Sequence, residues 1–209
     1  MYAEIAGLYL RYIAKYYAKD TIIVFDSYST VPSTKDQEHR RRFTTTAATV
    51  VITGDAPVHR NQTAFLSNSA NNSAFIDFLT KHLQMSGYAI RQAAGNADTL
   101  IVSTALELAA KMQRVIVVAS DMDNDTHILL TYHWKPNMAK IHMKRESTKS
   151  NTSTLVCTPL VQKTIGSLAV DCLLAIHAIS GCDMTSALFG HGKNTAFNRL
   201  SADGLQHHF

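Results

Sequence analysis

Val115-Ile116-Val117-Val118-Ala119-Ser120-Asp121-Met122-Asp123-Asn124-Asp125 is the stretch that decides the fold. Its four consecutive β-branched residues, 115–118, predict a strand buried on both faces, as in the interior of a parallel sheet. Asp121 and Asp123 follow at the carboxyl end of this strand, where ligands bind in open α/β sheets. Two carboxylates at this spacing repel each other unless a cation or a proton lies between them, and hard oxygen ligands suit Mg²⁺ or Mn²⁺. The stretch therefore predicts either a metal site or a polar loop that ends the strand.

The composition limits the class of protein. A chain of 209 residues forms one large domain, or one domain with an appendage, and can bury a sizeable core. The formal net charge of +4 is compatible with a polyanionic partner without requiring one. The three cysteines, Cys157, Cys172 and Cys182, form no C-x-x-C pair, which argues against a zinc ribbon or a disulfide framework. The chain shows neither a signal peptide nor an apolar run long enough to cross a bilayer, so we predict an intracellular protein, nuclear or cytoplasmic.

Helical and strand patterns alternate on both sides of the central stretch. Apolar residues at helical spacing predict a first helix over 4–18, and we interpret most of its tyrosines as core residues rather than as a base-stacking surface. A buried strand over 21–25 ends at Asp26, and residues 27–74 read as irregular, apart from a strand or weak helix over 44–52; the Asn/Ser-rich residues 68–73 read as a loop. The later elements are expected at 74–85 (helix), 88–90 (strand), 99–111 (helix), 128–132 (strand), 135–160 (an edge hairpin and a loop) and 165–179 (helix). This order predicts a single α/β domain over 1–209, a three-layer α/β/α fold with a mostly parallel central sheet.

Acidic residues recur at the ends of the predicted core elements. They occur in four places, each directly after an apolar segment: Asp26, Asp98, Asp121 with Asp123, and Asp183. One interpretation is a shared carboxylate cluster, which can hold two divalent ions roughly 3.5–4 Å apart. The other is that each acid acts separately, as Asp98 would if it capped the helix that follows it.

Basic residues follow the first of these acids. Lys35, Arg40, Arg41 and Arg42 lie in a polar segment shortly after Asp26. Such a run of charge is typical of a solvated face, and its position also fits contact with phosphate groups.

Four short motifs, in order along the chain, carry a resemblance to a known family. They are Val24-Phe25-Asp26, Gly95-Asn96-Ala97-Asp98-Thr99, Ser120-Asp121-Met122-Asp123, and the block from His177 to Lys193 that contains Gly181-Cys182-Asp183. These motifs resemble the acidic blocks of the PIN-like nuclease superfamily, in particular its flap-endonuclease branch and a group of invertebrate PIN-like proteins. The resemblance spans residues 22–193, nearly the whole chain.

The resemblance implies a metal-dependent, structure-specific nuclease that acts on nucleic acid, with DNA favoured over RNA. One or two Mg²⁺ or Mn²⁺ ions would be held by the five acids Asp26, Asp98, Asp121, Asp123 and Asp183. Residues 27–74 would be an arch-like insertion in which Lys35 and Arg40 to Arg42 contact the scissile phosphate. Residues 181–199 resemble a shortened glycine-rich hairpin, in which Gly190, Gly192 and Lys193 would grip a duplex backbone through main-chain N–H groups.

Two departures from the family pattern bear on catalysis. The family carries a further aspartate on a first strand before the N-terminal helix, and we expect both that strand and its acid to be missing here. The family also has an acid where this chain has Asn96, whose side chain brings no charge. The alternative prediction is therefore a catalytically degenerate PIN-like module that binds nucleic acid or a protein partner without cutting.

Three other interpretations fit less well. Asp121-x-Asp123 after a strand resembles the nucleophile motif of haloacid-dehalogenase phosphatases, but the surroundings of Asp183 do not match their second acidic motif. An EF-hand loop beginning at Asp121 fails because Thr126 stands in place of the glycine and Tyr132 in place of the final glutamate. The ten histidines lack the spacing of zinc ligands.

Overall fold

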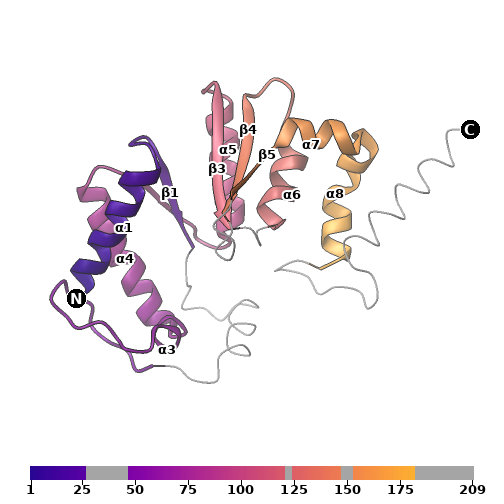
Figure 1. Cartoon of the computed structure of the whole chain (residues 1–209). Coiled ribbons are helices and arrows are strands. Elements are labelled where there is room, and N and C mark those ends of the chain that lie inside the picture. Colours follow the sequence, from indigo (N-terminus) through magenta and orange to yellow (C-terminus); the bar gives the residue numbers. More distant parts are fainter. Residues whose placement is uncertain (27–46, 121–123, 147–152, 182–209) are drawn as a thin grey trace, which may run out of the picture. The chain divides into compact units, whose positions relative to one another are not determined.

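The computed structural model describes residues 1–26, 47–120, 124–146 and 153–181 (Figure 1). Predictions that concern residues 27–46, 121–123, 147–152 and 182–209 lie outside these ranges. The chain, predicted as a single domain, divides into two compact units, Met1–Ala97 and Asp98–Phe209, and each is described by itself.

The first unit combines helices with a two-stranded parallel sheet. Its elements are α1 (Tyr2–Tyr16), β1 (Ile22–Phe25), α3 (Gln62–Leu66), α4 (Ser69–Met85) and β2 (Ala89–Gln92). Strands β1 and β2 pair in parallel, with Ile22 opposite Ala89 and Phe25 opposite Gln92. Side chains of α1, of α4 and of the residue that precedes β2 form its core: Ala6, Ile13, Leu79, Leu83 and Tyr88. The first helix, the helix over 74–85 and the strand at 88–90 are thus confirmed, with shifted ends.

The tyrosines of α1 correct one prediction. Tyr2 is buried at 2% exposure, whereas Tyr9, Tyr12 and Tyr16 are 45%, 47% and 54% exposed. Successive helical residues are turned by about 100°, so Tyr9 and Tyr16, three residues after Ala6 and Ile13, lie about 60° to the side of the buried stripe, and Tyr12, one residue before Ile13, lies about 100° away. The face that packs in the core is that of Ala6 and Ile13. The interpretation of most of these tyrosines as core residues is therefore wrong.

Asparagine caps correct the prediction that residues up to 74 are irregular. The side-chain oxygen of Asn61 accepts a hydrogen bond from the backbone N–H of Ala64 at 3.0 Å, at the start of α3. The side-chain oxygen of Asn68 accepts from the N–H of Ala70 at 2.9 Å and of Asn71 at 3.2 Å, at the start of α4. Each cap accepts hydrogen bonds from backbone N–H groups that have no partner within the first helical turn. The Asn/Ser-rich segment therefore begins a helix rather than forming a loop.

A buried asparagine holds the preceding segment against α4. Asn71 is 0% exposed; its Oδ1 accepts from the N–H of Val50 at 2.8 Å and its Nδ2 donates to the carbonyl of Ala48 at 3.0 Å. Residues 47–50 are accordingly neither helix nor strand, against the prediction of a strand or weak helix over 44–52. Helix α4 ends at Met85, and Gly87 follows with a left-handed φ of 81°, a conformation that suits a glycine after a helix.

The second unit is built around a three-stranded sheet. Its elements are α5 (Ala97–Ala109), β3 (Arg114–Ser120), α6 (Asn124–His133), β4 (Lys140–Glu146), β5 (Ser153–Cys157), α7 (Thr158–Ile165) and α8 (Ser167–Ile179). The strand order is β3-β4-β5, with β3 parallel to β4 and β4 antiparallel to β5. The edge hairpin predicted within 135–160 is confirmed, as are the strand at 115–119 and the helices over 99–111 and 165–179.

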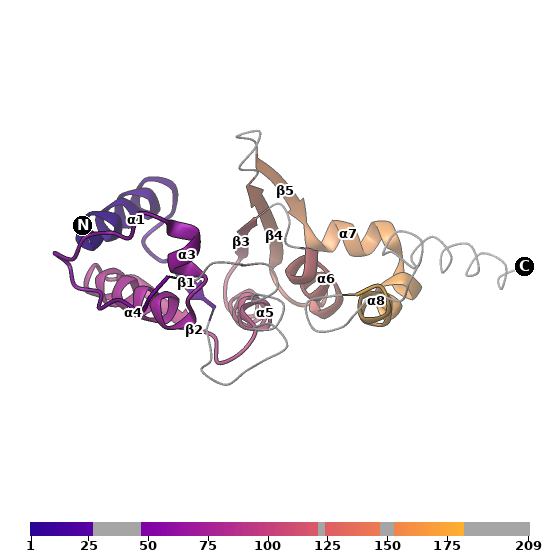
Figure 2. The same ribbon diagram turned by 90° about the horizontal axis from the view of Figure 1, so that it is seen from below.

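One face of β3 is buried and the other is exposed. Val115 and Val117 are each 8% exposed and pack with side chains from both α5 and α6, while Ile116 and Val118 are 49% and 38% exposed. The two helices supply side chains to the same face of the sheet, behind and beside β3 in Figures 1 and 2. The prediction that this strand is buried on both faces is therefore wrong.

Residues 128–132, predicted as a strand, belong to α6. Thr126, Leu130 and Thr131 are at most 2% exposed, a spacing that suits a helix face and not a strand. The Thr131 hydroxyl donates to the carbonyl of His127 at 2.8 Å, so this β-branched residue is satisfied inside the helix. A short apolar run fits either element, and packing of Leu130 in the core decides it here.

The α/β class is confirmed, and both β1–β2 and β3–β4 are parallel pairs. The strands that the structure describes form two sheets, and the three-layer arrangement around one sheet remains a prediction. Within the described ranges no single helix has the length and apolar character needed to cross a membrane; α7 and α8 meet those criteria only when taken together, across a bend of 103°.

Candidate functional site

The carboxyl ends of β3 and β4 lie level with each other in the second unit. The parallel register places Ser120 opposite Glu146, at the last position of both strands. Asp121 follows Ser120 directly in the chain, and α6 begins at Asn124. The predicted pair Asp121 and Asp123 therefore belongs to the segment that joins the end of β3 to the first turn of α6, although residues 121–123 themselves lie outside the described ranges.

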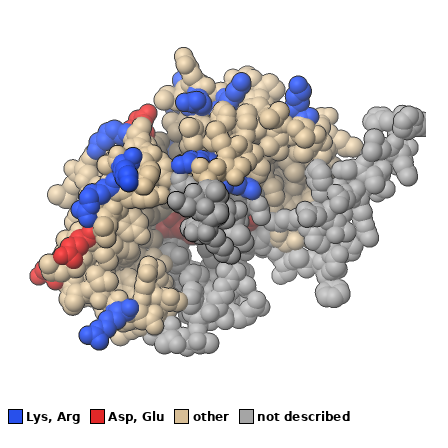
Figure 3. Space-filling model, in the orientation of Figure 1, with Lys and Arg blue, Asp and Glu red and all other residues tan. Residues whose placement is uncertain are grey.

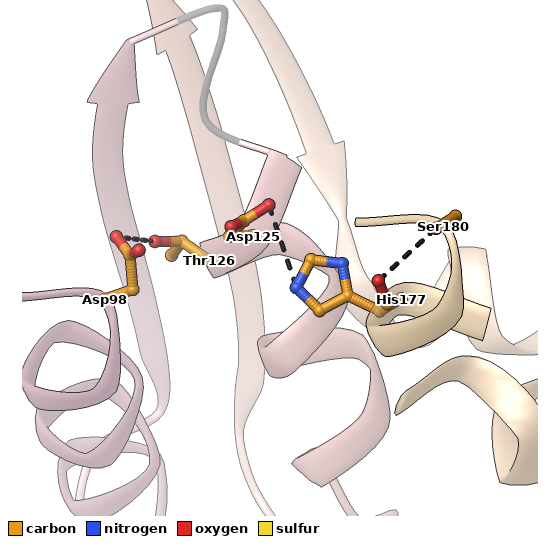
Figure 4. A network of polar contacts seen from close by, with 5 residues as sticks. All are labelled: Asp98, Asp125, Thr126, His177 and Ser180. Atoms are coloured by element: carbon orange, nitrogen blue, oxygen red, sulfur yellow. Dashed lines mark hydrogen bonds and ion pairs between the residues drawn. The ribbon is translucent and has the colours of Figure 1, made fainter. Parts of the chain in front are cut away.

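Asp98 reaches this edge from the start of α5. It lies in the first turn of a helix that begins at Ala97, so it is inside the helix and not at the capping position that precedes it. The hydroxyl of Thr126, which is 0% exposed, donates to Oδ1 of Asp98 at 3.1 Å (Figure 4). Carboxylates near helix N-termini are stabilised by the helix dipole. This contact brings together the first turns of α5 and α6.

A second contact joins α6 to the end of α8. Oδ1 of Asp125 lies 3.7 Å from Nε2 of His177, an ion pair when the imidazole is protonated. His177 is 8% exposed, and Ser180 donates from its hydroxyl to the His177 carbonyl at 3.3 Å (Figure 4). The first turn of α6 thus lies between the start of α5 and the last turn of α8.

Gly181 turns the chain out of α8. Its φ of 87° follows the cap residue Ser180, and this left-handed conformation is accessible to glycine without a side-chain clash. Cys182 and Asp183 come next in the chain and lie outside the described residues. The point from which the chain continues into Asp183 is therefore held near Asp125.

Arg145 and His127 form a basic pair at the same edge. Nη2 of Arg145 lies 3.3 Å from Nδ1 of His127, and Arg145 stands opposite Ala119 in the register of β3 and β4. Side chains alternate along a strand, so Arg145 shares the helix-covered face of β4 with Ile141 and Met143, both 0% exposed. A cationic side chain thus stands directly beyond the apolar core, beside the first turns of α6.

The predicted site residues divide into three groups. Asp98 takes part in the contacts just described. Asp26 is half-buried after the end of β1 in the first unit, and its role as a ligand stays a prediction. The others lie outside the described residues: Asp121, Asp123, Asp183, Lys35, Arg40, Arg41, Arg42, Gly190, Gly192 and Lys193.

The residues near the first turn of α6 can be compared with the ligands that a divalent metal ion requires. Among residues 1–26, 47–120, 124–146 and 153–181, no three His, Cys, Asp or Glu side chains gather as a metal site would require. The carboxylate of Asp98, from α5, contacts the Thr126 hydroxyl, and the carboxylate of the neighbouring Asp125 lies near His177. In the chain, Asp121 and Asp123 directly precede this turn of α6. Carboxylate oxygens are the donors that Mg²⁺ and Mn²⁺ prefer, so the donor type fits while the complete ligand set is not described.

Sequence reasoning missed four residues that the tertiary structure brings to this edge: Asp125, Thr126, Arg145 and His177. A signal existed for Thr126 and Asp125, because Asn-Asp-Thr before an apolar run is typical of a helix start. No local signal marks Arg145 as a neighbour of His127.

Comparison with protein-family models, with curated proteins and with solved structures finds no match for this chain. The chemistry of the site therefore rests on its own residues. Two carboxylates, two imidazoles and a guanidinium stand at the carboxyl edge of a parallel strand pair, the edge at which ligands bind in open α/β sheets.

Proposed function

We propose that this chain is a PIN-like α/β/α domain that hydrolyses phosphodiester bonds in nucleic acid with the help of Mg²⁺ or Mn²⁺. The observation that carries the proposal is the joining of three chain segments at the first turn of α6. Thr126 contacts Asp98, and Asp125 contacts His177, three residues before Ser180 and the chain leading to Asp183. Four of the five predicted metal ligands, Asp98, Asp121, Asp123 and Asp183, belong to these three chain segments or directly adjoin them in the sequence.

The residues have distinct roles in this proposal. Asp98, Asp121, Asp123 and Asp183 hold one or two divalent ions, and Thr126 fixes one carboxylate oxygen of Asp98 in place. The ions, when bound, lower the pKa of a water molecule and neutralise the scissile phosphate. The pair of Asp125 and His177 holds the end of α8 in position.

Nucleic acid is the proposed substrate, and DNA is favoured over RNA on the family resemblance. On the face drawn in Figure 3, lysine and arginine side chains of the described residues are spread over the surface rather than gathered in one patch. With a formal net charge of +4, the chain would hold a phosphate backbone through individual side chains that do not read base sequence.

Calorimetric titration of Mn²⁺ tests the metal site. The wild-type chain is compared with the double variant Asp121→Ala/Asp123→Ala, and with Asp77→Ala/Asp171→Ala as a matched control that removes two exposed acids elsewhere. We expect binding on the order of micromolar Kd in the wild type and the control, and its loss in the first variant. Cleavage is then measured on flap, hairpin and single-stranded substrates of DNA and RNA. A folded wild type that binds no Mn²⁺ would contradict the proposal.

The second candidate function is a degenerate PIN-like module that binds nucleic acid or protein without cutting. Asn96 favours it, because this uncharged side chain directly precedes α5, two residues before Asp98. A missing negative charge there would weaken the attraction for a divalent cation. Restoring an acid at this position, as in Asn96→Asp, separates the two functions.

A further inference from the structure

We infer that the exposed tyrosines of α1 form a stacking surface for a single strand of nucleic acid. The inference deepens the proposed function and rests on it for nucleic acid as the ligand. It concerns a surface of the first unit, whereas the candidate metal site lies in the second. The surface, named the tyrosine stripe, consists of Leu8, Tyr9, Tyr12 and Tyr16, with the cations Arg11 and Lys15 beside it.

The packing of α1 determines which of its side chains face outward. Ala6 and Ile13 pack in the core of the first unit, and the Tyr2 ring lies 5.8 Å from the ring of Phe65 and 6.0 Å from that of Phe75, between centroids. These contacts fix the rotation of the helix (indigo in Figure 1) about its own axis. At about 100° per residue, the four residues of the stripe then fall within one arc of about 100° beside the core face. All four are at least 45% exposed.

The rings of the stripe are held by one another and by a cation. The ring centroids of Tyr12 and Tyr16 are 4.9 Å apart, with the ring planes at 52° to each other. Nζ of Lys15 lies 4.9 Å from the Tyr16 centroid. A tyrosine side chain has few rotatable torsions, so ordering its ring against a base costs little conformational entropy. An aromatic face and an ammonium group thus lie next to each other, the pairing with which single-strand-binding proteins hold a base and the backbone.

The charges around the stripe favour an anionic partner. Residues 5–19 contain no Asp or Glu, and their charged residues are Arg11, Lys15 and Lys19. Glu4, the one acid of α1, lies in its first turn and is paired with the N-terminal amine at 2.6 Å. Two copies of the chain that met through this stripe would bring like charges together, whereas a phosphate backbone would be attracted.

The length of the stripe suits a short run of bases. Tyr9 and Tyr16 are seven residues apart, about 10 Å along the helix axis. That distance accommodates about three bases at roughly 3.4 Å each. Because every base has an aromatic face, stacking on tyrosine binds a strand without reading its sequence. Only a single strand offers unpaired bases for such contacts, so the stripe selects single-stranded over duplex nucleic acid.

Binding of a labelled single strand to the full chain, measured by fluorescence anisotropy with a chelator present, tests the stripe without metal or catalysis. The probe is oligo(dT) of about twelve nucleotides, within the site sizes of single-strand-binding modules. We expect Tyr9→Ala/Tyr16→Ala to weaken binding about thirtyfold or more, because each lost stacking contact costs at least about fivefold. The control Leu160→Ala/Leu168→Ala, which shortens two exposed apolar side chains of the second unit, should stay within about twofold of wild type.

Two further substitutions at the same tyrosines separate stacking from the burial of apolar surface. Tyr9→Phe/Tyr16→Phe keeps both rings and should stay within about threefold of wild type. Tyr9→Leu/Tyr16→Leu keeps apolar side chains without a flat ring and should bind within about threefold of the alanine variant.

The cations are tested by the salt dependence of binding. Each phosphate contact with a single strand contributes about 0.7 to the slope of log affinity against log salt concentration. Arg11→Gln/Lys15→Gln should therefore lower the magnitude of this slope by about 1.4. The matched pair Arg60→Gln/Lys81→Gln, at exposed positions of the first unit outside α1, should leave the slope unchanged.

Three results would overturn the stripe as a nucleic-acid surface. The first is a wild type that does not bind the oligonucleotide, and the second is equal affinity in Tyr9→Ala/Tyr16→Ala and the leucine control of the second unit. The third is wild-type affinity in Tyr9→Leu/Tyr16→Leu, which would mark an apolar docking surface for protein. Thermal unfolding of each variant, with phenylalanine as the conservative substitution, controls for the fold.

Titration of Mn²⁺ distinguishes this inference from the nuclease proposal. A chain that binds the oligonucleotide through Tyr9 and Tyr16 yet binds no Mn²⁺ would contradict the nuclease and leave the stripe standing. Mn²⁺-dependent cleavage of single strands that is unchanged in Tyr9→Ala/Tyr16→Ala would overturn the stripe and leave the nuclease standing.

Discussion

Thr126 and Asp98 are 28 residues apart in the chain, and their side chains meet at 3.1 Å in a hydrogen bond that joins the first turns of two helices. The donor is fully buried and the acceptor is a carboxylate at a helix start. A hydrogen bond to a charged group in such a setting is worth more than one between neutral groups.

Replacing Thr126 by valine removes this hydroxyl with little change of shape. We expect the free energy of unfolding to fall by about 1.5–3 kcal/mol, because the Asp98 carboxylate loses a buried donor. Thr131→Val is the matched control: the same substitution on the same helix removes a hydrogen bond to a backbone carbonyl and should cost about 0.5–1.5 kcal/mol. Urea unfolding measures both, and equal losses would show that the Asp98 contact carries no additional stability.

The pair of Asp125 and His177 should couple α6 to the end of α8. A double-mutant cycle with Asp125→Asn and His177→Gln is expected to give a coupling energy of about 1 kcal/mol. Because an imidazole is charged only when protonated, the coupling should be larger at about pH 5.5 than at about pH 8. The measurement is urea unfolding of the four proteins at both pH values. A coupling energy of zero, or an equal coupling energy at the two pH values, would contradict an ion pair between Asp125 and His177.

Adding a carboxylate at position 96 distinguishes an impaired nuclease from a binding module. Asn96→Asp places a negative charge directly before α5, and in an impaired nuclease it should raise Mn²⁺ affinity and Mg²⁺- or Mn²⁺-dependent cleavage by at least about tenfold. Asn137→Asp, which adds the same charge at an exposed position of the second unit, should change neither. A pure binding module stays inactive after the change at position 96.

Asn71 should be the most sensitive polar residue of the first unit. Its truncation to alanine leaves the N–H of Val50 and the carbonyl of Ala48 without their side-chain partner, and we expect a loss of about 2–4 kcal/mol in the free energy of unfolding. Gln84→Ala, on the exposed side of the same helix, should stay within about 0.5 kcal/mol of wild type. Thermal or urea unfolding measures the loss of stability in each variant. Similar losses for Asn71→Ala and Gln84→Ala would show that the segment 47–50 does not depend on Asn71.

Local patterns in the sequence were sufficient for much of the secondary structure. The β-branched run at 115–118 predicted β3, and the patterns over 74–85 and 135–160 predicted α4 and the β4–β5 hairpin. The caps at Asn61 and Asn68 were also readable and were missed, because an Asn/Ser-rich segment fits a loop equally well until the helix behind it is packed.

The sequence by itself determined the α/β class, the strand that precedes Asp121 and the order of the acidic motifs, since these depend on residues that are neighbours along the chain. The tertiary structure alone decided that only one face of β3 is buried, that 128–132 is helical, and that Arg145 meets His127 and Asp125 meets His177. Each of these depends on strand register and on the packing of helices distant in sequence. A side chain's partner across such a distance is fixed by the shared core beneath it, which no local pattern encodes.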